Sequence, residues 1–297
     1  MNVLIIGKKF DNYSTRRLFN VLEKRNYKVQ FISPLNCTLR LEGKSFDIIY
    51  QHDIIPQPEI AILRCISYTD FGVSVTRDLE LYLGIHLKNQ GVLCVNDPEA
   101  KFKTSSKFLA FQILNNKNIP TLPTYLIADL SEVPKILNKY LDFPMIVKTN
   151  EGTWGMGVEL VGDIKMAQNI FKKRIERNRI ILFQNYIKEA QEQDIRVFVV
   201  NGRAIAAMRR ISQNDNFRSN IHQGGKAECI DLPDSYKNIA ISATKALGLE
   251  IAGVDILETK SGPLVLEVNP SPGLEQIEKT TNVDIANQIV DYLETLL

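Results

Sequence analysis

Apolar residues in the first hundred positions alternate between short continuous runs and helical spacing. The run NVLIIG at 2–7 is continuous, as in strands buried on both faces of a parallel sheet. Ser14 and Thr15 precede apolar positions three and four residues apart, which predicts a capped helix through Leu18 and Leu22. Further strands are expected at 28–33 and 59–66, and a further helix at 73–89, closed by Gly91. This alternation predicts a small α/β domain in which helices cover a sheet.

The rest of the chain mixes helices with strand pairs. The segment 103–120 predicts a capped helix that ends at Asn118 and Pro120. Asn201-Gly202 is a favoured pair for a two-residue turn, so 194–212 is expected to form a hairpin. Other strands are expected at 124–128, 144–148 and 179–187, other helices at 131–141, 164–177, 235–247 and 284–296, a polar loop at 213–226 and a second hairpin within 251–273. Hairpins beside helices predict an α+β body.

Composition is that of an ordinary globular protein. A chain of 297 residues can hold two or three domains and bury a substantial core. The net charge is +2 and no long basic run occurs, which argues against a nucleic-acid binder. No apolar stretch approaches the roughly 20 residues of a membrane span, and the N-terminus lacks the basic segment and cleavage site of a signal peptide.

Cysteine, histidine and early glycine usage excludes several kinds of site. The four cysteines are scattered without a CxxC pair, which suits a reducing cytoplasm and packing roles. The three histidines are far apart in sequence, so zinc is not indicated. Gly7 is the only glycine near the first strand, so the GxGxxG fingerprint of dinucleotide binding is absent at this end.

The segment IAGVDILETKSGPLVLEVNPSPG carries two acids and an amide on one predicted hairpin. Strands that pair about the middle of the turn at 260–262 bring Asp255 opposite Glu267, and Asn269 shares the face of Glu267. Opposed Cβ atoms lie about 4.5–5.5 Å apart, so three oxygen ligands converge. Such a set suits Mg²⁺ held together with nucleotide phosphates. The alternative is a solvated acidic face with lysine partners.

A glycine-rich loop, Glu151–Gly157, follows a predicted strand that ends at Lys148. Glycines let a backbone approach phosphate oxygens with its N–H groups pointing inward. No Gly-Lys-Ser/Thr opens a helix here, so the loop is not a Walker A motif, and a flexible hairpin loop is the alternative. Lys107 and Lys148 carry the point charges that suit phosphate, although each is equally consistent with a surface lysine.

Two further segments have unusual composition. FRSNIHQGG at 217–225 crowds donors into a loop, where Arg218 could hold a transferring phosphoryl group and Asn220 could bind metal or phosphate. His222 could be a general base or a hydrogen-bonded loop histidine. NPSPGLEQIEKTT at 269–281 predicts a rigid turn, after which Glu275 and Glu278 are expected to be capping or solvated rather than catalytic.

These motifs, in this order, resemble the ATP-grasp superfamily and within it the RimK-like α-L-glutamate ligases. The resemblance is carried by Lys107, Lys148 with EGTWGMGV, FQNYIKEA, Asp194-Ile195-Arg196, FRSNIHQGG, AGVDIL and LEVNPSPGLEQIEKTTNVDIA. It extends over nearly the whole chain and is densest over 144–286. It implies an ATP-grasp fold of α/β and α+β parts, with a small Rossmann-like α/β domain in front. The implied division is 1–97 for the preceding domain, 98–185 for the N-subdomain with the glycine loop, and 186–297 for the C-subdomain with the magnesium and phosphoryl site.

The resemblance also implies roles for individual residues. Nucleotide contacts are implied for Lys107, Lys148, Gly152, Gly155, Gly157, Asn185, Tyr186, Asp194, Arg218, Ser219 and Asn220, catalytic roles for Arg218 and Asn269, and magnesium binding for Asp255, Glu267 and Asn269. Position 185 is often acidic in relatives and is asparagine here, which leaves a backbone contact to adenine intact and puts only a side-chain role in doubt.

The implied reaction is ATP-dependent ligation of a carboxylate to the amine of L-glutamate through an acylphosphate, with Mg²⁺, or Mn²⁺ as its substitute, as the cofactor. The acceptor would be the C-terminus of a ribosomal small-subunit protein, or a glutamyl peptide or poly-α-glutamate. A RimK-like ligase with a different acceptor (a cofactor, an amino-group carrier protein or N-acetylaspartate) is an alternative, and a non-catalytic ATP-binding protein is another. A cytoplasmic homo-oligomer, dimer or tetramer, is expected, with no direct nucleic-acid or membrane partner.

Overall fold

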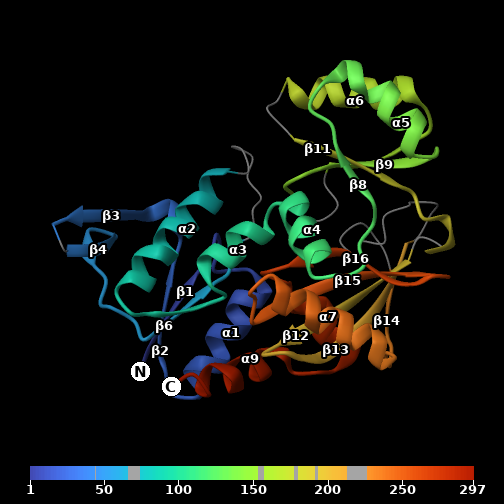
Figure 1. The fold of residues 1–297 in the computed structure, drawn as a ribbon. Coiled ribbons are helices and arrows are strands. Elements are labelled where there is room, and N and C mark those ends of the chain that lie inside the picture. The colour runs from blue at the N-terminus through green and yellow to red at the C-terminus, as the bar shows by residue number, and fades with distance from the viewer. Residues whose placement is uncertain (44, 66–73, 153–156, 177–179, 191–192, 213–225) are drawn as a thin grey trace.

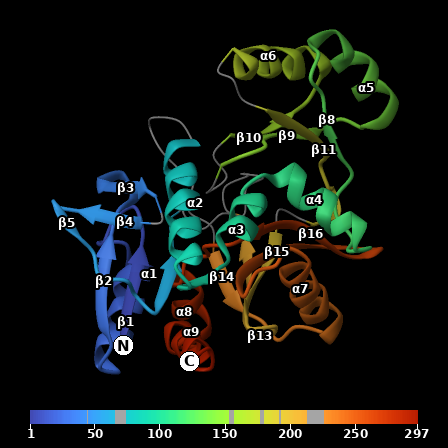
Figure 2. The same cartoon turned by 60° about the vertical axis from the view of Figure 1, so that its left-hand side comes forward.

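The computed structural model describes most of the chain. The described residues are 1–43, 45–65, 74–152, 157–176, 180–190, 193–212 and 226–297. In them the strands form four sheets. Figures 1 and 2 show an N-terminal group of elements beside a large sheet, with a smaller sheet and its two helices standing apart from both. Because the two chain ends lie close together, the last helix can pack on the first.

The N-terminal group confirms the expected alternation of strands and helices. Its parallel sheet has the order β2-β1-β6-β7. The elements are β1 Asn2–Ile6, α1 Tyr13–Lys24, β2 Lys28–Ile32, β6 Ile60–Leu63, α2 Ser74–Asn89 and β7 Leu93–Val95. Helix α1 is capped by Asn12, whose side chain accepts from the Ser14 N–H, so the expected caps at Ser14 and Thr15 are wrong. Both of those residues are buried in the first turn.

A small antiparallel sheet, absent from the sequence predictions, projects from this group. It consists of β3 Cys37–Glu42, β4 Ser45–Tyr50 and β5 Asp53–Ile54, preceded by the 3-10 turn η1 Pro34–Asn36. Ile48 and Ile55 pack with Leu4 and Leu83 in one apolar cluster, so the added sheet covers part of the N-terminal core.

The smaller four-stranded sheet has the order β10-β9-β11-β8 and carries the glycine-rich loop between two of its strands. Its elements are β8 Thr124–Leu126, η2 Leu130–Glu132, α5 Val133–Tyr140, β9 Met145–Thr149, β10 Val158–Val161, α6 Ile164–Ile175 and β11 Ile181–Asn185. Val147, Phe171 and Phe183 lie in a separate apolar core beneath α5 and α6. This subdomain therefore has its own core and stands over the large sheet (Figures 1 and 2).

The large sheet has five strands in the order β14-β13-β12-β15-β16. The elements of this part are α3 Pro98–Thr104, α4 Lys107–Asn116, η3 Lys188–Ala190, β12 Gln193–Val200, β13 Arg203–Ile211, β14 Lys226–Cys229, α7 Asp234–Ala246, β15 Ile251–Thr259, β16 Gly262–Asn269, α8 Glu275–Thr281 and α9 Ile285–Glu294. Asn201 and Gly202 both have positive φ, at 47° and 68°, as the predicted hairpin turn requires. The capped helix expected over 103–120 is α4, with Ser106 as its N-cap, and it is preceded by a separate short helix, α3, that ends at Thr104.

One apolar core joins the N-terminal sheet to the large sheet. Ile5 and Leu22 from the N-terminal group share it with Phe198, Ile277 and Ile289 from the C-terminal half. The other face of the large sheet packs on α4 and α7. The division of the chain at residues 97 and 185 stays a prediction. Among the described residues, no helix is both long enough and apolar enough to span a membrane.

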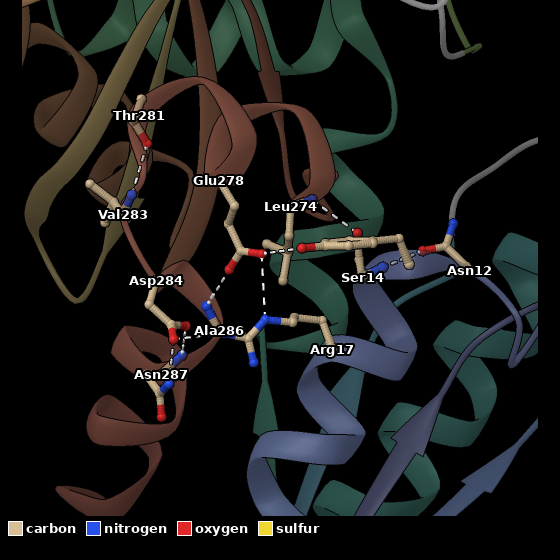
Figure 3. A network of polar contacts seen from close by, with 11 residues as sticks. Asn12, Ser14, Arg17, Leu274, Glu278, Thr281, Val283, Asp284, Ala286 and Asn287 are labelled. Atoms are coloured by element: carbon tan, nitrogen blue, oxygen red, sulfur yellow. Dashed lines mark hydrogen bonds and ion pairs between the residues drawn. The ribbon is translucent and has the colours of Figure 1, made fainter.

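Polar contacts also fasten α1 to α8 and α9 (Figure 3). Glu278 accepts hydrogen bonds from the Tyr13 hydroxyl at 2.9 Å and from the Ala286 N–H at 3.0 Å. Arg17 pairs with Glu278 at 3.6 Å and with Asp284 at 2.6 Å. Only 8% of the Glu278 side chain is exposed. Glu278 is therefore a buried link between three helices, and a solvated role for it is wrong.

Its neighbour Glu275 behaves as expected. It is half exposed and pairs with Lys279 one turn further along α8, at 2.6 Å. The two acids of this helix thus have different roles: Glu278 links α8 to α1 and α9, whereas Glu275 pairs within α8.

Candidate functional site

Asp255 and Glu267 face each other across β15 and β16, as predicted. The turn itself is different from the prediction. Thr259 pairs with Gly262, so only Lys260 and Ser261 connect the strands. A register shift then follows at Ile256, which leaves Leu266 as an extra residue on β16. This bulge brings Glu267, rather than Leu266, opposite Asp255.

Two arginines from the neighbouring strands hold Asp255. Arg196 lies directly opposite it on β12 and pairs with both carboxylate oxygens, with Nη2 at 2.7 Å from Oδ2. Arg210 on β13 approaches Oδ2 to 2.9 Å. Burial by itself would raise the pKa of Asp255, but the two guanidinium groups outweigh it and hold the pKa below its usual value. Asp255 is therefore a buried, ionised carboxylate.

The backbone on this face makes room for Arg196. A Cβ added to Gly253 would lie 3.1 Å from Cδ and from Nη1 of Arg196, and 2.8 Å from Cβ of Pro272. The glycine two residues before Asp255 is thus needed for close approach of the guanidinium and of the turn after β16. Arg196 and Arg210 had no role in the sequence predictions. Asp194 and Arg196 lie on the same face of one strand. This pattern indicates a partner for Asp255 only once β12 is known to pair with β15.

Asn269 completes the predicted oxygen set at the end of β16. It pairs with Gly253, one step along the same face from the facing acids, and its Oδ1 accepts from the Ser271 N–H at 3.0 Å. Among the described residues no group of three or more His, Cys, Asp and Glu side chains could hold a metal ion. A hard cation here would therefore use the carboxylates of Asp255 and Glu267 with the Asn269 amide oxygen, and this donor set fits Mg²⁺.

Two lysines lie near this face, Lys107 at the start of α4 and Lys148 on β9 of the smaller sheet. Lys107, the first residue of α4, lies 3.3 Å from Oε1 of Glu267 and donates to the Gly152 carbonyl at 2.8 Å. Lys148 on β9 lies 5.0 Å from the centre of the Phe111 ring on α4, a cation–π contact. Among the described residues the Lys148 ammonium has no carboxylate partner. Burial lowers the pKa of Lys148 to about 7, helped by the charge of Lys107 and opposed by Glu267.

The described ends of the glycine-rich loop are tightly constrained. Gly157 has φ +75°, and its carbonyl accepts from Arg174 Nη1 at 2.7 Å. A Cβ there would lie 2.9 Å from Thr149 Oγ1, so glycine is needed both for conformation and for space. Gly152 presents its carbonyl to Lys107. The predicted phosphate ligand Gly155 and the predicted site residues Arg218, Ser219 and Asn220, with His222, lie outside the described residues.

The remaining predicted nucleotide residues have structural contacts. The Asn185 side chain accepts from the Asp142 N–H at 3.0 Å, which agrees with a nucleotide contact through the backbone only. Tyr186 follows directly after β11. Asp194 is buried and pairs with Arg210 at 2.5 Å. Arg210 therefore links Asp194 to Asp255, and the two acids belong to one charge network.

The turn after Asn269 is held by the N-terminal group almost residue by residue. Asn96 donates to the carbonyls of Ile251 and Pro270, each at 2.8 Å. Arg64 donates to the Pro272 carbonyl at 2.8 Å, and Ser14 accepts from the Leu274 N–H at 2.9 Å. The sequence gives no signal for these contacts, because each joins residues more than 150 positions apart.

A cavity borders the same hairpin from the N-terminal side. Its empty volume, including the solvent at its mouth, is about 620 Å³. Its lining at the hairpin includes Glu267 and Asn269, and its lining elsewhere includes Arg77, Lys101 and Phe102. Convergent polar side chains beside apolar ones are typical of the lining of ligand pockets.

Comparison with known proteins identifies the family to which the chain belongs. Residues 1–100 match the family described as the RimK PreATP-grasp domain, and residues 104–293 match the RimK-like ATP-grasp domain. A protein of Aeromonas salmonicida (strain A449) named "Probable alpha-L-glutamate ligase" is 37% identical over 99% of this chain and 96% of its own length. A protein of the same name from Haemophilus influenzae (strain ATCC 51907 / DSM 11121 / KW20 / Rd) is 36% identical over 99% and 97%.

A solved structure of the ATP-grasp ligase PsnB, complexed with minimal precursor, Mg and ADP, has the same fold. Its TM-score is 0.70 at 20% identity, over 99% of this chain and 97% of that one. The resemblance and the fold class drawn from the motifs are thereby confirmed. The chain belongs to the RimK-like family of ATP-grasp ligases.

Proposed function

We propose that this protein is an ATP-dependent ligase that joins the amine of L-glutamate to an acceptor carboxylate. The acceptor would be the C-terminus of a ribosomal small-subunit protein, or a glutamyl peptide extended into poly-α-glutamate. One observation carries the proposal: Lys107 of α4 lies 3.3 Å from Glu267, whose carboxylate is aligned with that of Asp255, and the buried Lys148 of the smaller sheet packs beside α4. The names of the full-length relatives support glutamate as the amine.

The residues divide into a nucleotide side and a metal side. The phosphates of ATP would be bound by Lys107, Lys148 and the glycine-rich loop. Adenine would contact the segment at the end of β11, at Asn185 and Tyr186. The ribose would face Asp194. Asp255, Glu267 and Asn269 would hold Mg²⁺, with Mn²⁺ as a substitute, and Arg218 with Ser219 and Asn220 would contact the transferring phosphoryl group. When bound, the metal would neutralise charge on the phosphate oxygens.

The chemistry needs no side-chain nucleophile. A carboxylate oxygen of the acceptor attacks the γ-phosphorus of ATP, the bond from that phosphorus to the bridging oxygen breaks, and ADP leaves. The amine nitrogen of glutamate then attacks the acyl carbon, the carbon–oxygen bond to phosphate breaks, and the amine loses a proton. The protein positions the reactants and stabilises charge, with the lysines disposed toward the phosphoryl oxygens.

The direct test uses the purified protein with ATP, Mg²⁺ and glutamate, with and without a peptide ending in Glu-Glu. We expect ADP release and, by mass spectrometry, a ladder of glutamyl additions. The ladder would rank the peptide against free glutamate as acceptor. ATP binding without ADP release or a ladder would contradict the proposal and favour another amine or acceptor, or a non-catalytic role.

Lys148 should make ATP binding dependent on pH. Its pKa of about 7 leaves the free protein mostly neutral at this position at pH 8.5, whereas phosphate oxygens favour the charged ammonium. Binding at pH 8.5 should therefore take up close to one proton, and ATP affinity should fall as pH rises from 7.5 to 9. Calorimetry in two buffers of different ionisation enthalpy measures the uptake.

A matched pair of variants tests the assignment. Lys148→Met should abolish the proton uptake, whereas Lys139→Met, which alters an exposed lysine of the same subdomain, should leave it unchanged. Binding to the unaltered protein without proton uptake at pH 8.5 would show that Lys148 does not meet the phosphates.

A further inference from the structure

The cavity beside the hairpin connects the metal side of the site to the N-terminal group. Lys107, Gly152, Glu267 and Asn269 line it where phosphoryl transfer would occur. Helix α2 lines it elsewhere, through Arg77 and neighbouring residues. A molecule in this cavity could therefore present one end to the phosphoryl site and the other to α2.

The lysines that line the cavity already have partners within the protein. Lys101 is buried, pairs with the buried Glu80 and also donates to the Cys65 carbonyl at 2.8 Å. Lys107 is shared between Gly152 and Glu267. The buried Lys101–Glu80 pair does not exchange easily for a ligand, and Lys107 is the lysine proposed to meet the phosphates of ATP.

Arg77 is different in its partners and its geometry. Its guanidinium carbon lies 4.6 Å from the centre of the Phe102 ring, a cation–π contact that holds the guanidinium at the cavity wall. Nε donates to Asp78 at a long 3.3 Å, and Nη1 donates to Glu151. Within the described part of the chain, Nη2 makes no hydrogen bond. Arg77 thus offers an oriented fork with unused donors at the cavity wall.

We propose that this cavity is the acceptor subsite and that Arg77 binds the side-chain carboxylate of an acidic acceptor residue. The inference rests on the proposed ligase function and adds to it the residue that would recognise the side-chain carboxylate at the end of the acceptor. Its terminal carboxylate is directed to the end lined by Glu267 and Asn269, while its side-chain carboxylate reaches the guanidinium. Arginine suits this task because its fork can bind both oxygens of a carboxylate.

Glu151 provides the internal comparison. It belongs to the start of the glycine-rich loop and takes one Arg77 donor in this structure. If Arg77 served only to anchor that loop, Glu151→Gln and Arg77→Gln would have the same effect. If Arg77 binds the acceptor, removal of the Glu151 charge frees a donor, so the two variants should diverge.

The experiment measures binding of two dipeptides, Glu-Glu and Glu-Gln, to the full-length protein by calorimetry, and their steady-state KM by ADP release. The dipeptides differ only in the charge of the terminal side chain. We expect the unaltered protein to bind Glu-Glu at least about tenfold more tightly than Glu-Gln, a discrimination typical of one charge-assisted pair. Arg77→Gln should remove that preference and raise the KM for Glu-Glu about tenfold, with the KM for ATP changed less than about twofold. Glu151→Gln should keep the preference.

The outcomes separate this inference from the proposed function. Ligation with an unchanged Glu-Glu preference in Arg77→Gln would overturn the inference and leave the ligase function standing. Equal changes in the KM for ATP in Arg77→Gln and Glu151→Gln, with the Glu-Glu preference kept, would show that Arg77 only anchors the loop. That result would also overturn the inference. Arg77-dependent binding of Glu-Glu without any ligation would support the subsite and refute the function. No preference in the unaltered protein would overturn the subsite.

Discussion

Replacing Glu267 by glutamine is expected to reduce ADP release by at least about 100-fold while the fold stays intact. Loss of a residue that merely supports a metal ligand typically costs 10–100-fold, so loss of a ligand charge should exceed that range. The Glu267 side chain is about a third exposed, and the nearest cation is Lys107 at 3.3 Å. Stability should therefore change by no more than about 0.5 kcal/mol, as for other partly exposed pairs. Initial rates and urea unfolding measure the two effects.

The hairpin offers its own control for this variant. Glu258→Gln makes the same change nearer the turn, where the side chain is partly exposed and pairs with Arg209 at 2.8 Å. It should leave both rate and stability near those of the unaltered protein. A full rate in Glu267→Gln would remove Glu267 from the metal site. A cellular role that persisted unchanged in that variant would favour a non-catalytic ATP-binding protein.

The local part of the site could be predicted because it depends on alternation along two adjacent strands. Strand periodicity places Glu267 and Asn269 on one face of β16, and pairing about Ser261 predicts that Asp255 lies opposite Glu267, as it does. The actual route to this pairing, a shorter turn compensated by a bulge at Leu266, could not be predicted. Both registers satisfy the same apolar pattern near the turn, and only packing in the folded sheet decides between them.

The long-range part of the site could not be predicted. Arg196 and Asp255 meet because β12 pairs with β15, and Asn96 reaches Ile251 and Pro270 because the N-terminal group packs on the end of the large sheet. No periodicity in one segment reports its partner in another. The antiparallel sheet β3-β4-β5 was missed for a different reason. Its strands carry several exposed and charged residues, so the apolar alternation that predicts a half-buried strand is weak there.

Replacing Asp255 by asparagine should, unlike the change at Glu267, lower stability as well as activity. The carboxylate is buried and balances Arg196 and Arg210, and breaking a buried pair by removing one partner typically costs about 3–5 kcal/mol. We expect a loss in that range by urea unfolding, together with at least about a 100-fold fall in ADP release. Asp231→Asn, which alters a fully exposed aspartate, should change neither.

The dependence of this loss on pH identifies the charge as its cause. The pKa of Asp255 is held below its usual value in the folded protein, so the unfolded chain binds the proton more readily. Its stabilising contribution is then fully present above the unfolded pKa of about 3.9 and is lost as pH falls through the folded value. The stability difference between the unaltered protein and Asp255→Asn should therefore be constant from pH 6 to 8 and shrink below about pH 4.

A second substitution separates the buried charge from other effects of the asparagine. In the double variant Asp255→Asn, Arg196→Met, the unbalanced guanidinium is gone, so at least about 1 kcal/mol of the lost stability should return, while activity stays absent. No recovery would mean that Arg196 does not carry the cost. Two acids that face each other across one strand pair would thus differ in kind. At the proposed metal site, Glu267 would exchange Lys107 for a metal at little cost, whereas Asp255 would bind one only while its two arginines keep it ionised and in position.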